Sequence, residues 1–277
     1  MTRALVLGGG GVTGVAWELG IVAGLAERDV ALAEADLVVG TSAGSVVGAQ
    51  VCSGRPVEQS YEAQLAPPGG EVAARFGFAA VARLVWAGGR TRDAVRSRAR
   101  IGAMAVAART PSEASRRAVI EARLPQRDWP GRRLLVTAVD AASGEFVVFD
   151  ADSGVSLVDA VGASCAVPGV WPPVTIGGRR FIDGGMRSAV NADLARGAQR
   201  VVVLAPTAAA FGPMPRLSAQ VAALRAAGSQ VAVVAPDAAA RAAIGRNVLD
   251  PARRAAAARA GRAQAAAVRD EVAAVWG

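Results

Sequence analysis

Short apolar runs alternate with helical patterns over the first fifty residues. Residues 2–7 and 36–39 are nearly continuous apolar segments, typical of strands buried in a sheet. Residues 12–27 carry apolar side chains at helical spacing, and residues 45–53 are expected to form a second helix. Two strand–loop–helix units of this length predict a parallel sheet that is covered by helices.

The pattern changes after residue 54 and returns to strands near residue 134. Between them we expect arginine-rich helices, broken by PPGG at 67–70 and by Gly88-Gly89. The other expected elements are a hairpin of strands 134–140 and 145–150, a helix at 157–166, a second hairpin turning on Gly177-Gly178, strands 201–204 and 230–234, and an alanine-rich helix at 252–276. We predict a single domain over residues 1–277, with a helical, arginine-rich insertion at about 55–133 and a C-terminal helix at about 251–276.

Composition excludes several kinds of chemistry. The 277 residues contain no histidine and no lysine, so all 31 basic side chains are arginine. Histidine-dependent triads, histidine zinc sites and lysine-containing phosphate loops are ruled out, and we expect neither a metal nor a cofactor. Two cysteines are too few for a disulfide framework, and no apolar run approaches the roughly 18 residues that span a bilayer. The alanine and arginine bias is typical of a GC-rich bacterial genome, and we expect a cytoplasmic location.

GTSAG, at residues 40–44, follows a predicted strand and precedes a predicted helix. In that context Gly40 and Gly44 would let the chain turn sharply and present the Ser42 hydroxyl at the start of the helix, as a nucleophile. The alternative is an ordinary glycine-rich turn. The strand and helix on either side favour the nucleophile.

A serine nucleophile needs a base, and without histidine the base must be another group. Our candidate is Asp183 in FIDGG, because Gly184 and Gly185 permit a close backbone approach and would present the carboxylate at the sheet edge. Asp140 and Asp150 also end strands, so spacing alone does not select Asp183. We expect burial beside apolar strands to raise the pKa of Asp183.

The glycine run at residues 8–11 has two interpretations. The pattern G-x-G-x-x-G from Gly9 would suit a dinucleotide, but GTSAG stands where that site needs an acidic residue, at the end of the second strand. The backbone amides of Gly9, Gly10 and Gly11, at the mouth of a helix, could instead stabilise an oxyanion formed during acyl transfer. We favour the oxyanion interpretation.

The succession GGGGVTG, GTSAG and DGG resembles the patatin-like phospholipase family of acyl hydrolases, as does the segment ASCAVPGVWPPVTIGGRRFIDGG that leads into Asp183. The resemblance implies a three-layer α/β/α patatin-like fold with a central, mostly parallel sheet. It also implies a dyad of Ser42 and Asp183, an oxyanion hole in the glycine loop, and hydrolysis of fatty acyl esters in lipids. The glycines that would support these motifs are Gly14, Gly40, Gly44, Gly184 and Gly185.

Positive charge is concentrated in the predicted insertion. Thirteen arginines and four acidic residues lie between Arg83 and Arg133, a local net charge of +9 against +8 for the whole chain. With Val85 and Trp86 beside them, these arginines suit peripheral contact with an anionic membrane surface or a lid, and a solvated helix face is the alternative. A single tyrosine and the lack of a recognition motif argue against nucleic acid.

We therefore predict a serine acyl hydrolase with a lipid or ester substrate. One position departs from the family, because Thr13 stands where the glycine loop usually carries arginine or lysine. Loss of that cation is expected to weaken anion stabilisation or to alter headgroup preference. The alternatives are a general carboxylesterase for short or non-lipid esters, and a catalytically weak lipid-binding protein of the same fold.

Overall fold

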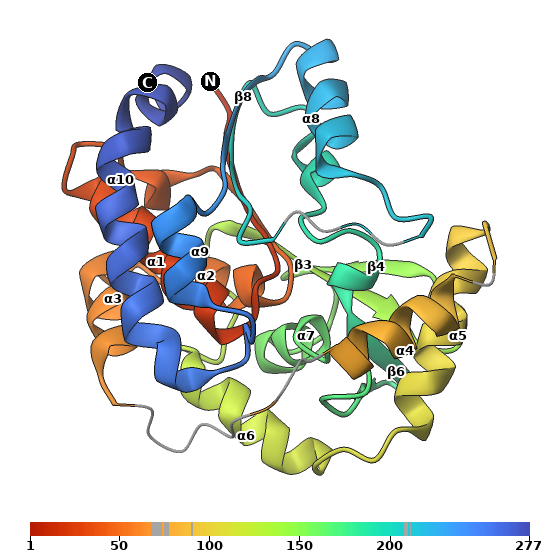
Figure 1. Ribbon diagram of the computed structural model, residues 1–277. Coiled ribbons are helices and arrows are strands. Elements are labelled where there is room, and N and C mark those ends of the chain that lie inside the picture. The colour runs from red at the N-terminus through yellow and green to blue at the C-terminus, as the bar shows by residue number, and fades with distance from the viewer. Residues whose placement is uncertain (68–73, 75–77, 90, 208–209, 211) are drawn as a thin grey trace.

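A mixed sheet with helices on both faces forms the centre of the computed structural model (Figure 1). The structure describes residues 1–277 except 68–73, 75–77, 90, 208–209 and 211. Over the described residues the sheet has eight strands in the order β5-β6-β3-β2-β1-β7-β8, with β4 also paired to β3. The strands are β1 (Arg3–Leu7), β2 (Leu37–Gly40), β3 (Arg133–Asp140), β4 (Phe146–Phe149), β5 (Val174–Ile176), β6 (Arg179–Asp183), β7 (Arg200–Leu204) and β8 (Gln230–Val234).

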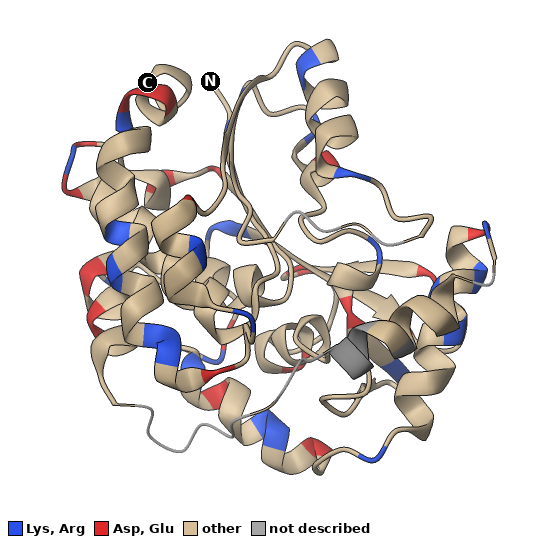
Figure 2. Ribbon diagram, in the orientation of Figure 1, with Lys and Arg blue, Asp and Glu red and all other residues tan. Residues whose placement is uncertain are grey.

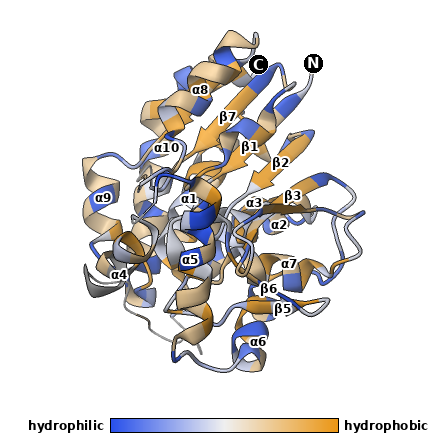
Figure 3. Cartoon of the chain, turned by 90° about the vertical axis from the view of Figure 1, so that its right-hand side faces the viewer, coloured by the Kyte–Doolittle hydropathy of each residue, from blue (hydrophilic) through white to orange (hydrophobic). Residues whose placement is uncertain are grey.

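Five neighbouring strands of the sheet, β3, β2, β1, β7 and β8, run parallel to one another. On β1, Leu5 and Leu7 face one helix layer, and Ala4 and Val6 face the other; all four are fully buried. Burial on both faces explains why these strands are continuous apolar runs, visible as orange arrows in Figure 3. The predicted three-layer fold with a mostly parallel sheet is confirmed.

The antiparallel part of the sheet brings two strand ends together. β2 pairs with β3 as far as Val136, and β6 pairs with β3 from Ala138 to Asp140. β4 pairs with residues 136–139 and therefore occupies the opposite edge of β3. Since β2 and β6 run toward each other along one edge of β3, their last residues, Gly40 and Asp183, approach each other.

Helices cover the two faces of the sheet in unequal number. The face that bears Leu5 and Leu7 packs against α1 (Gly11–Ala26), α2 (Ala43–Cys52), α7 (Leu157–Ser164), α9 (Ala238–Ile244) and α10 (Arg254–Trp276). The opposite face packs against α8 (Leu217–Ala226), and the neighbouring α4 (Phe78–Gly88) and α5 (Ala94–Ala107) pack on β3 and β6. Among the described residues, no helix is long and apolar enough to cross a membrane.

The arginine-rich insertion is helical, as predicted. It contains α4, α5, α3 (Val57–Leu65) and α6 (Glu113–Arg123), and Figure 2 shows basic residues on α5 and α6 as well as on α10. The break at Gly88-Gly89 is confirmed, whereas the one expected at PPGG falls on residues 68–70, outside the described part of the chain. We did not predict α8 and α9, which are short and rich in alanine, so that their apolar periodicity is weak.

Candidate active site

Ser42 occupies a strained turn between β2 and α2. Its φ of 52° and ψ of −115° lie where residues other than glycine are rarely found, and such strain is often stored at functional sites. The turn requires glycine on both sides of Ser42. A Cβ on Gly44 would collide with the Leu7 carbonyl, and a Cβ on Gly40 would collide with the backbone of Gly44 and Ser45. The Ser42 N–H donates to the Ser164 hydroxyl at 2.8 Å, which fixes the turn against α7.

Asp183 lies at the end of β6 and lines the same cavity as Ser42. The Gly185 N–H donates to its Oδ1 at 2.7 Å. Burial raises the pKa of Asp183 to about 7, although the nearby Ser42 side chain and the Gly185 amide both act to lower it. The predicted direction of this shift is confirmed. Gly184 permits the turn that follows, because a Cβ there would collide with Thr137.

The glycine loop between β1 and α1 lies against Ser42. A Cβ on Gly9 would stand 3.5 Å from the Ser42 Cβ. The Gly9 N–H donates to the Ala189 carbonyl at 2.7 Å, so this amide is already engaged, which corrects our expectation that it would face the substrate. Within the described residues, the N–H groups of Gly10 and Gly11 have no such partner, as is usual for the first amides of a helix.

Thr13 stands where the family resemblance led us to expect a basic residue. It is fully buried, and its N–H and its hydroxyl both donate to the Val248 carbonyl at 3.2 Å. The Gly14 N–H donates to the Gly10 carbonyl at 2.8 Å and belongs to the first turn of α1. Thr13 therefore joins the glycine loop to the segment between α9 and α10, a contact that no sequence pattern indicated.

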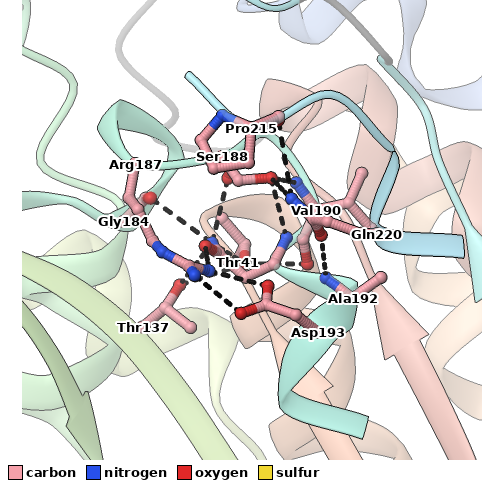
Figure 4. Close-up of polar contacts among 11 residues, drawn as sticks. Thr41, Thr137, Gly184, Arg187, Ser188, Val190, Ala192, Asp193, Pro215 and Gln220 are labelled. Atoms are coloured by element: carbon pink, nitrogen blue, oxygen red, sulfur yellow. Dashed lines mark hydrogen bonds and ion pairs between the residues drawn. The ribbon is translucent and has the colours of Figure 1, made fainter. Parts of the chain in front are cut away.

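A buried polar network lies behind the two candidate catalytic turns (Figure 4). At its centre is Asn191, fully buried and with a left-handed φ of 53°. Its Nδ2 donates to the Thr41 hydroxyl at 3.0 Å and to the Ser188 carbonyl at 2.9 Å, with a longer contact of 3.4 Å to the Gly184 carbonyl. Thr41 and Gly184 are the chain neighbours of the serine and the aspartate, so Asn191 ties the two turns together.

Two more side chains hold this network in place. The Arg187 guanidinium donates to the Asn191 Oδ1 at 2.9 Å and forms a two-pronged ion pair with Asp193 at 2.6–2.7 Å. The Gln220 Nε2 donates to the Ser188 hydroxyl at 2.8 Å from the far side. Sequence analysis missed all of these residues, because isolated polar side chains in a loop give no periodic signal.

A cavity of about 450 Å³ opens in front of these groups. Its lining includes Ser42, Asp183 and the loop glycines, together with mostly apolar residues from α4, α5 and the segment before α10. Among the described lining residues, only Asp183 and Arg246 are charged. A second cavity of about 430 Å³, between α1, α2, α3 and α6, contains none of the predicted site residues. Of these two cavities, the first reaches Ser42 and can therefore present an apolar ligand to this side chain.

The neighbouring thiol takes no charged part in the site. The Cys165 thiol donates to the Ser42 carbonyl at 3.3 Å, and burial raises its pKa to about 11. Cys52 is also free and buried, with a pKa raised by burial to about 12. The part of the chain that the structure describes contains no group of three or more cysteine and acidic residues able to hold a metal ion.

The fold and this arrangement define an α/β protein with a serine on a sharp strand–helix turn and a buried carboxylate beside it. The family model described as "Patatin-like phospholipase" matches residues 5–196. The chain therefore belongs to the patatin-like phospholipase family, and at the level of the family it is a lipid hydrolase. Curated proteins gave no match to the sequence.

Two solved structures are similar in fold at low sequence identity. One is VipD from Legionella pneumophila, with 15% identity, a TM-score of 0.48, and coverage of 98% of this chain and 67% of that one. The other is the type III effector protein ExoU, with 16% identity, a TM-score of 0.42, and coverage of 98% of this chain and 53% of that one. The chain thus spans about half the length of the ExoU chain.

Proposed function

We propose that the protein is a serine acyl hydrolase that cleaves fatty acyl ester bonds of lipids, including phospholipids, with Ser42 as nucleophile and Asp183 as general base. The observation that carries the proposal is that Ser42, on its strained turn, and the buried carboxylate of Asp183, with a pKa of about 7, line the same cavity. Near neutral pH a large share of this carboxylate is ionised, and it is a stronger base than an ordinary aspartate.

The proposed reaction has two halves that use the same residues. In the first, Asp183 accepts the Ser42 proton while Oγ attacks the ester carbonyl, and the proton then passes to the departing alcohol. In the second, Asp183 accepts a proton from water, the hydroxide attacks the acyl-enzyme, and Ser42 leaves with the proton as the fatty acid is released. Asp183 is ionised at the start and at the end, and water is the only co-reactant.

The oxyanion that forms in each half of the reaction would accept hydrogen bonds from the N–H groups of Gly10 and Gly11. These amides have no hydrogen-bond partner among the described residues, and they open α1, whose dipole adds positive potential. Gly9 keeps a different role, because its N–H holds the loop to the Ala189 carbonyl next to Ser42. The proposal for the oxyanion hole therefore narrows from three amides to two.

Two other functions would use the same fold. A general carboxylesterase for short esters would need the same dyad, but a mostly apolar cavity of about 450 Å³ favours a fatty acyl chain. A lipid-binding protein with little catalysis would keep the cavity and would not need Ser42 to be reactive. The strained turn at Ser42 favours the enzyme over this second alternative.

Covalent labelling with a fluorophosphonate tests the proposal directly. We expect wild type to be labelled and Ser42→Ala to be unlabelled, with Ser60→Ala on α3 as a matched control that is labelled like wild type. Hydrolysis of p-nitrophenyl esters of increasing chain length would then separate a lipid acyl hydrolase, which prefers long chains, from a short-chain esterase. A wild-type protein that is neither labelled nor active on any ester would overturn the enzyme proposal.

Contact with a lipid surface through α4 and α5 is a second part of the proposal. Apart from Met1, the large apolar side chains that are most exposed in the described residues all lie on these two helices: Val85, Trp86, Val95 and Val106. Val85 also lines the cavity, so the exposed apolar surface is continuous with its wall. Arg92, Arg96 and Arg100 are exposed nearby and suit an anionic membrane. The cytoplasmic location, and with it the inner membrane surface, stays a prediction.

Vesicle co-sedimentation tests this contact separately from catalysis. Wild type should bind vesicles of phosphatidylcholine with phosphatidylglycerol more tightly than phosphatidylcholine alone, and high salt should weaken that binding. The double variant Arg92→Gln/Arg96→Gln should lose the preference for anionic lipid, while Trp86→Ser should weaken binding to both. Binding that is indifferent to anionic lipid and to salt would remove the membrane contact and leave the dyad proposal intact.

A further inference from the structure

Arg246 is an isolated cation on the wall of the cavity that contains Ser42. It is exposed, and within the described residues its side chain makes no hydrogen bond, ion pair or ring contact. Asp183 is the only other charged residue in the described lining, and its carboxylate accepts from the Gly185 N–H. The carboxylate of Asp250, four residues later, forms an ion pair with Arg253, with 3.8 Å between Oδ2 and Nε. Among the described residues, the cavity therefore presents one guanidinium that no carboxylate pairs with.

The segment that carries Arg246 is held against the glycine loop. The Val248 carbonyl accepts hydrogen bonds from both donors of Thr13, and a Cβ on Gly11 would collide with it. On the other side, Arg253 donates to the carbonyls at the end of α9, where Gly245 has a φ of 72°. The segment that carries Arg246 is therefore anchored to the rest of the protein on both sides of this residue.

We propose that Arg246 forms an anion-binding subsite that selects esters with a phosphate group on the alcohol side of the scissile bond. This inference rests on the proposed function and adds to it the residue that recognises the phosphate of the substrate. A guanidinium stays positively charged at physiological pH and matches two phosphate oxygens with paired N–H donors. The acyl chain would fill the apolar part of the cavity, and the phosphate of the leaving alcohol would remain at the Arg246 wall.

Arg246 lies next to the part of the chain that binds the uncharged glycine loop. Thr13 is fully buried and both of its donors are used, so the loop supplies no cation to the substrate. Arg246 lies two residues before the carbonyl that Thr13 binds, outside the family match at residues 5–196. In this proposal the C-terminal part of the chain provides a positive charge at the wall of the larger cavity that reaches Ser42.

Two monomeric substrates that differ only in the phosphate test the subsite: 1-hexanoylglycerol 3-phosphate and 1-hexanoylglycerol. For Arg246→Gln we expect kcat/KM to fall by about 10-fold to 100-fold on the phosphate ester and to change little on the neutral ester. Arg246→Lys should recover part of the loss, since it restores the charge without the paired donors. Arg196→Gln, an exposed arginine outside the cavity lining, is the matched control and should leave both substrates unaffected.

Binding to the Ser42→Ala variant gives a readout that does not need catalysis. Hexyl phosphate should bind this variant more tightly than hexanol by calorimetry, and adding Arg246→Gln should remove the difference. Inorganic phosphate, measured in the same way, shows whether the site takes the free anion: binding as tight as that of hexyl phosphate would overturn a lipid-side subsite.

The outcomes separate the two proposals. If wild type is not labelled by the fluorophosphonate and hydrolyses no ester, the proposed function fails, while loss of hexyl phosphate binding in the Arg246→Gln background still supports the subsite. If wild type hydrolyses both esters and Arg246→Gln lowers both equally or neither, the subsite is overturned and the dyad stands.

Discussion

Two aspartates at strand ends, Asp140 on β3 and Asp183 on β6, expose almost none of their surface and have very different surroundings. They are 4% and 3% exposed, and their strands pair with each other antiparallel. Asp140 accepts hydrogen bonds from the N–H groups of Ala142 and Ser143 at 2.8–2.9 Å and pairs with Arg179 at 2.8 Å. Asp183 accepts from the Gly185 N–H and lines the same cavity as Ser42.

The two pKa values are shifted in opposite directions. Burial acts to raise the pKa of Asp140, but the Ser143 amide, the Arg179 side chain and the Ala142 amide together outweigh it and hold the pKa below its usual value. For Asp183 burial dominates and raises the pKa to about 7. The difference in pKa therefore reflects both the partners that surround Asp140 and the deeper burial of Asp183, and it leaves Asp183 as the carboxyl that can exchange a proton near neutral pH.

The amide variants Asp183→Asn and Asp140→Asn should give the largest effects, because the first removes the proposed base and the second removes a carboxylate that stabilises the fold. The amide introduced by Asp183→Asn keeps the shape of the side chain but cannot accept the serine proton, so we expect kcat to fall by about 1000-fold. Asp140→Asn should change kcat little and lower the free energy of unfolding by about 1–3 kcal/mol, because it weakens charge-assisted hydrogen bonds.

Ester hydrolysis and urea denaturation measure both effects on the same preparations. Asp150→Asn, at the end of the more exposed strand β4, is a control that should change neither quantity much. The assignment of the base would be wrong if Asp140→Asn lost as much kcat as Asp183→Asn while remaining folded.

The pH dependence of kcat/KM should follow the carboxyl that acts as base. Since Asp183 must be ionised to accept the proton and its pKa is about 7, activity should rise with pH through this value. At pH 5 about 1% of the carboxyl is ionised, so we expect a roughly 100-fold loss relative to the plateau. The profile is measured on a soluble ester whose own hydrolysis is subtracted. An acid limb near pH 4 or lower would show that the acting base is an ordinary or a stabilised carboxylate such as Asp140.

Asn191 should affect catalysis through the turns that carry Ser42 and Asp183, and it should not affect the surroundings of Asp140. Asn191→Gly keeps the left-handed backbone available and removes the amide that binds Thr41 and Ser188, so we expect about a 10-fold loss in kcat with KM almost unchanged. Asn191→Ala adds the strain of a Cβ at positive φ and should cost about a further 1 kcal/mol of stability. Steady-state kinetics and thermal denaturation of the pair separate positioning from backbone strain; wild-type kcat in Asn191→Gly would exclude a positioning role.

Most of the fold could be predicted from sequence because the elements that build it are locally patterned. The buried parallel strands are apolar runs, the loops between them contain glycine, and the hairpin on Gly177-Gly178 uses two residues with positive φ. The helices α8 and α9 escaped prediction because alanine and arginine give little contrast between a buried and an exposed face.

The candidate site was predictable only in part, because motifs identify residues and not their partners. Ser42 and Asp183 were selected by their motifs, whereas nothing in the spacing distinguished Asp183 from Asp140. That distinction depends on Arg179 and on the amides that surround one carboxyl and not the other. The engaged amide of Gly9 likewise depends on a carbonyl far away in the chain. Such contacts form between segments that only the folded sheet brings together.

The smallest effect we expect is on stability, where the two aspartates should again behave oppositely. A carboxyl whose pKa is raised by folding stabilises the folded state below its unfolded value of 3.8 and loses that contribution as pH rises through about 7. The amide introduced by Asp183→Asn does not titrate, so the variant should not lose this contribution. The unfolding free energy of the variant minus that of wild type should therefore rise by about 1 kcal/mol between pH 6 and pH 8. Asp140 has a lowered pKa, so its contribution is present above 3.8 and is lost as pH falls through the folded value. Asp140→Asn should therefore be least damaging at acidic pH. Urea denaturation of both variants from pH 4 to pH 8 measures the two trends, and parallel trends would contradict the opposite shifts on which the choice of base depends.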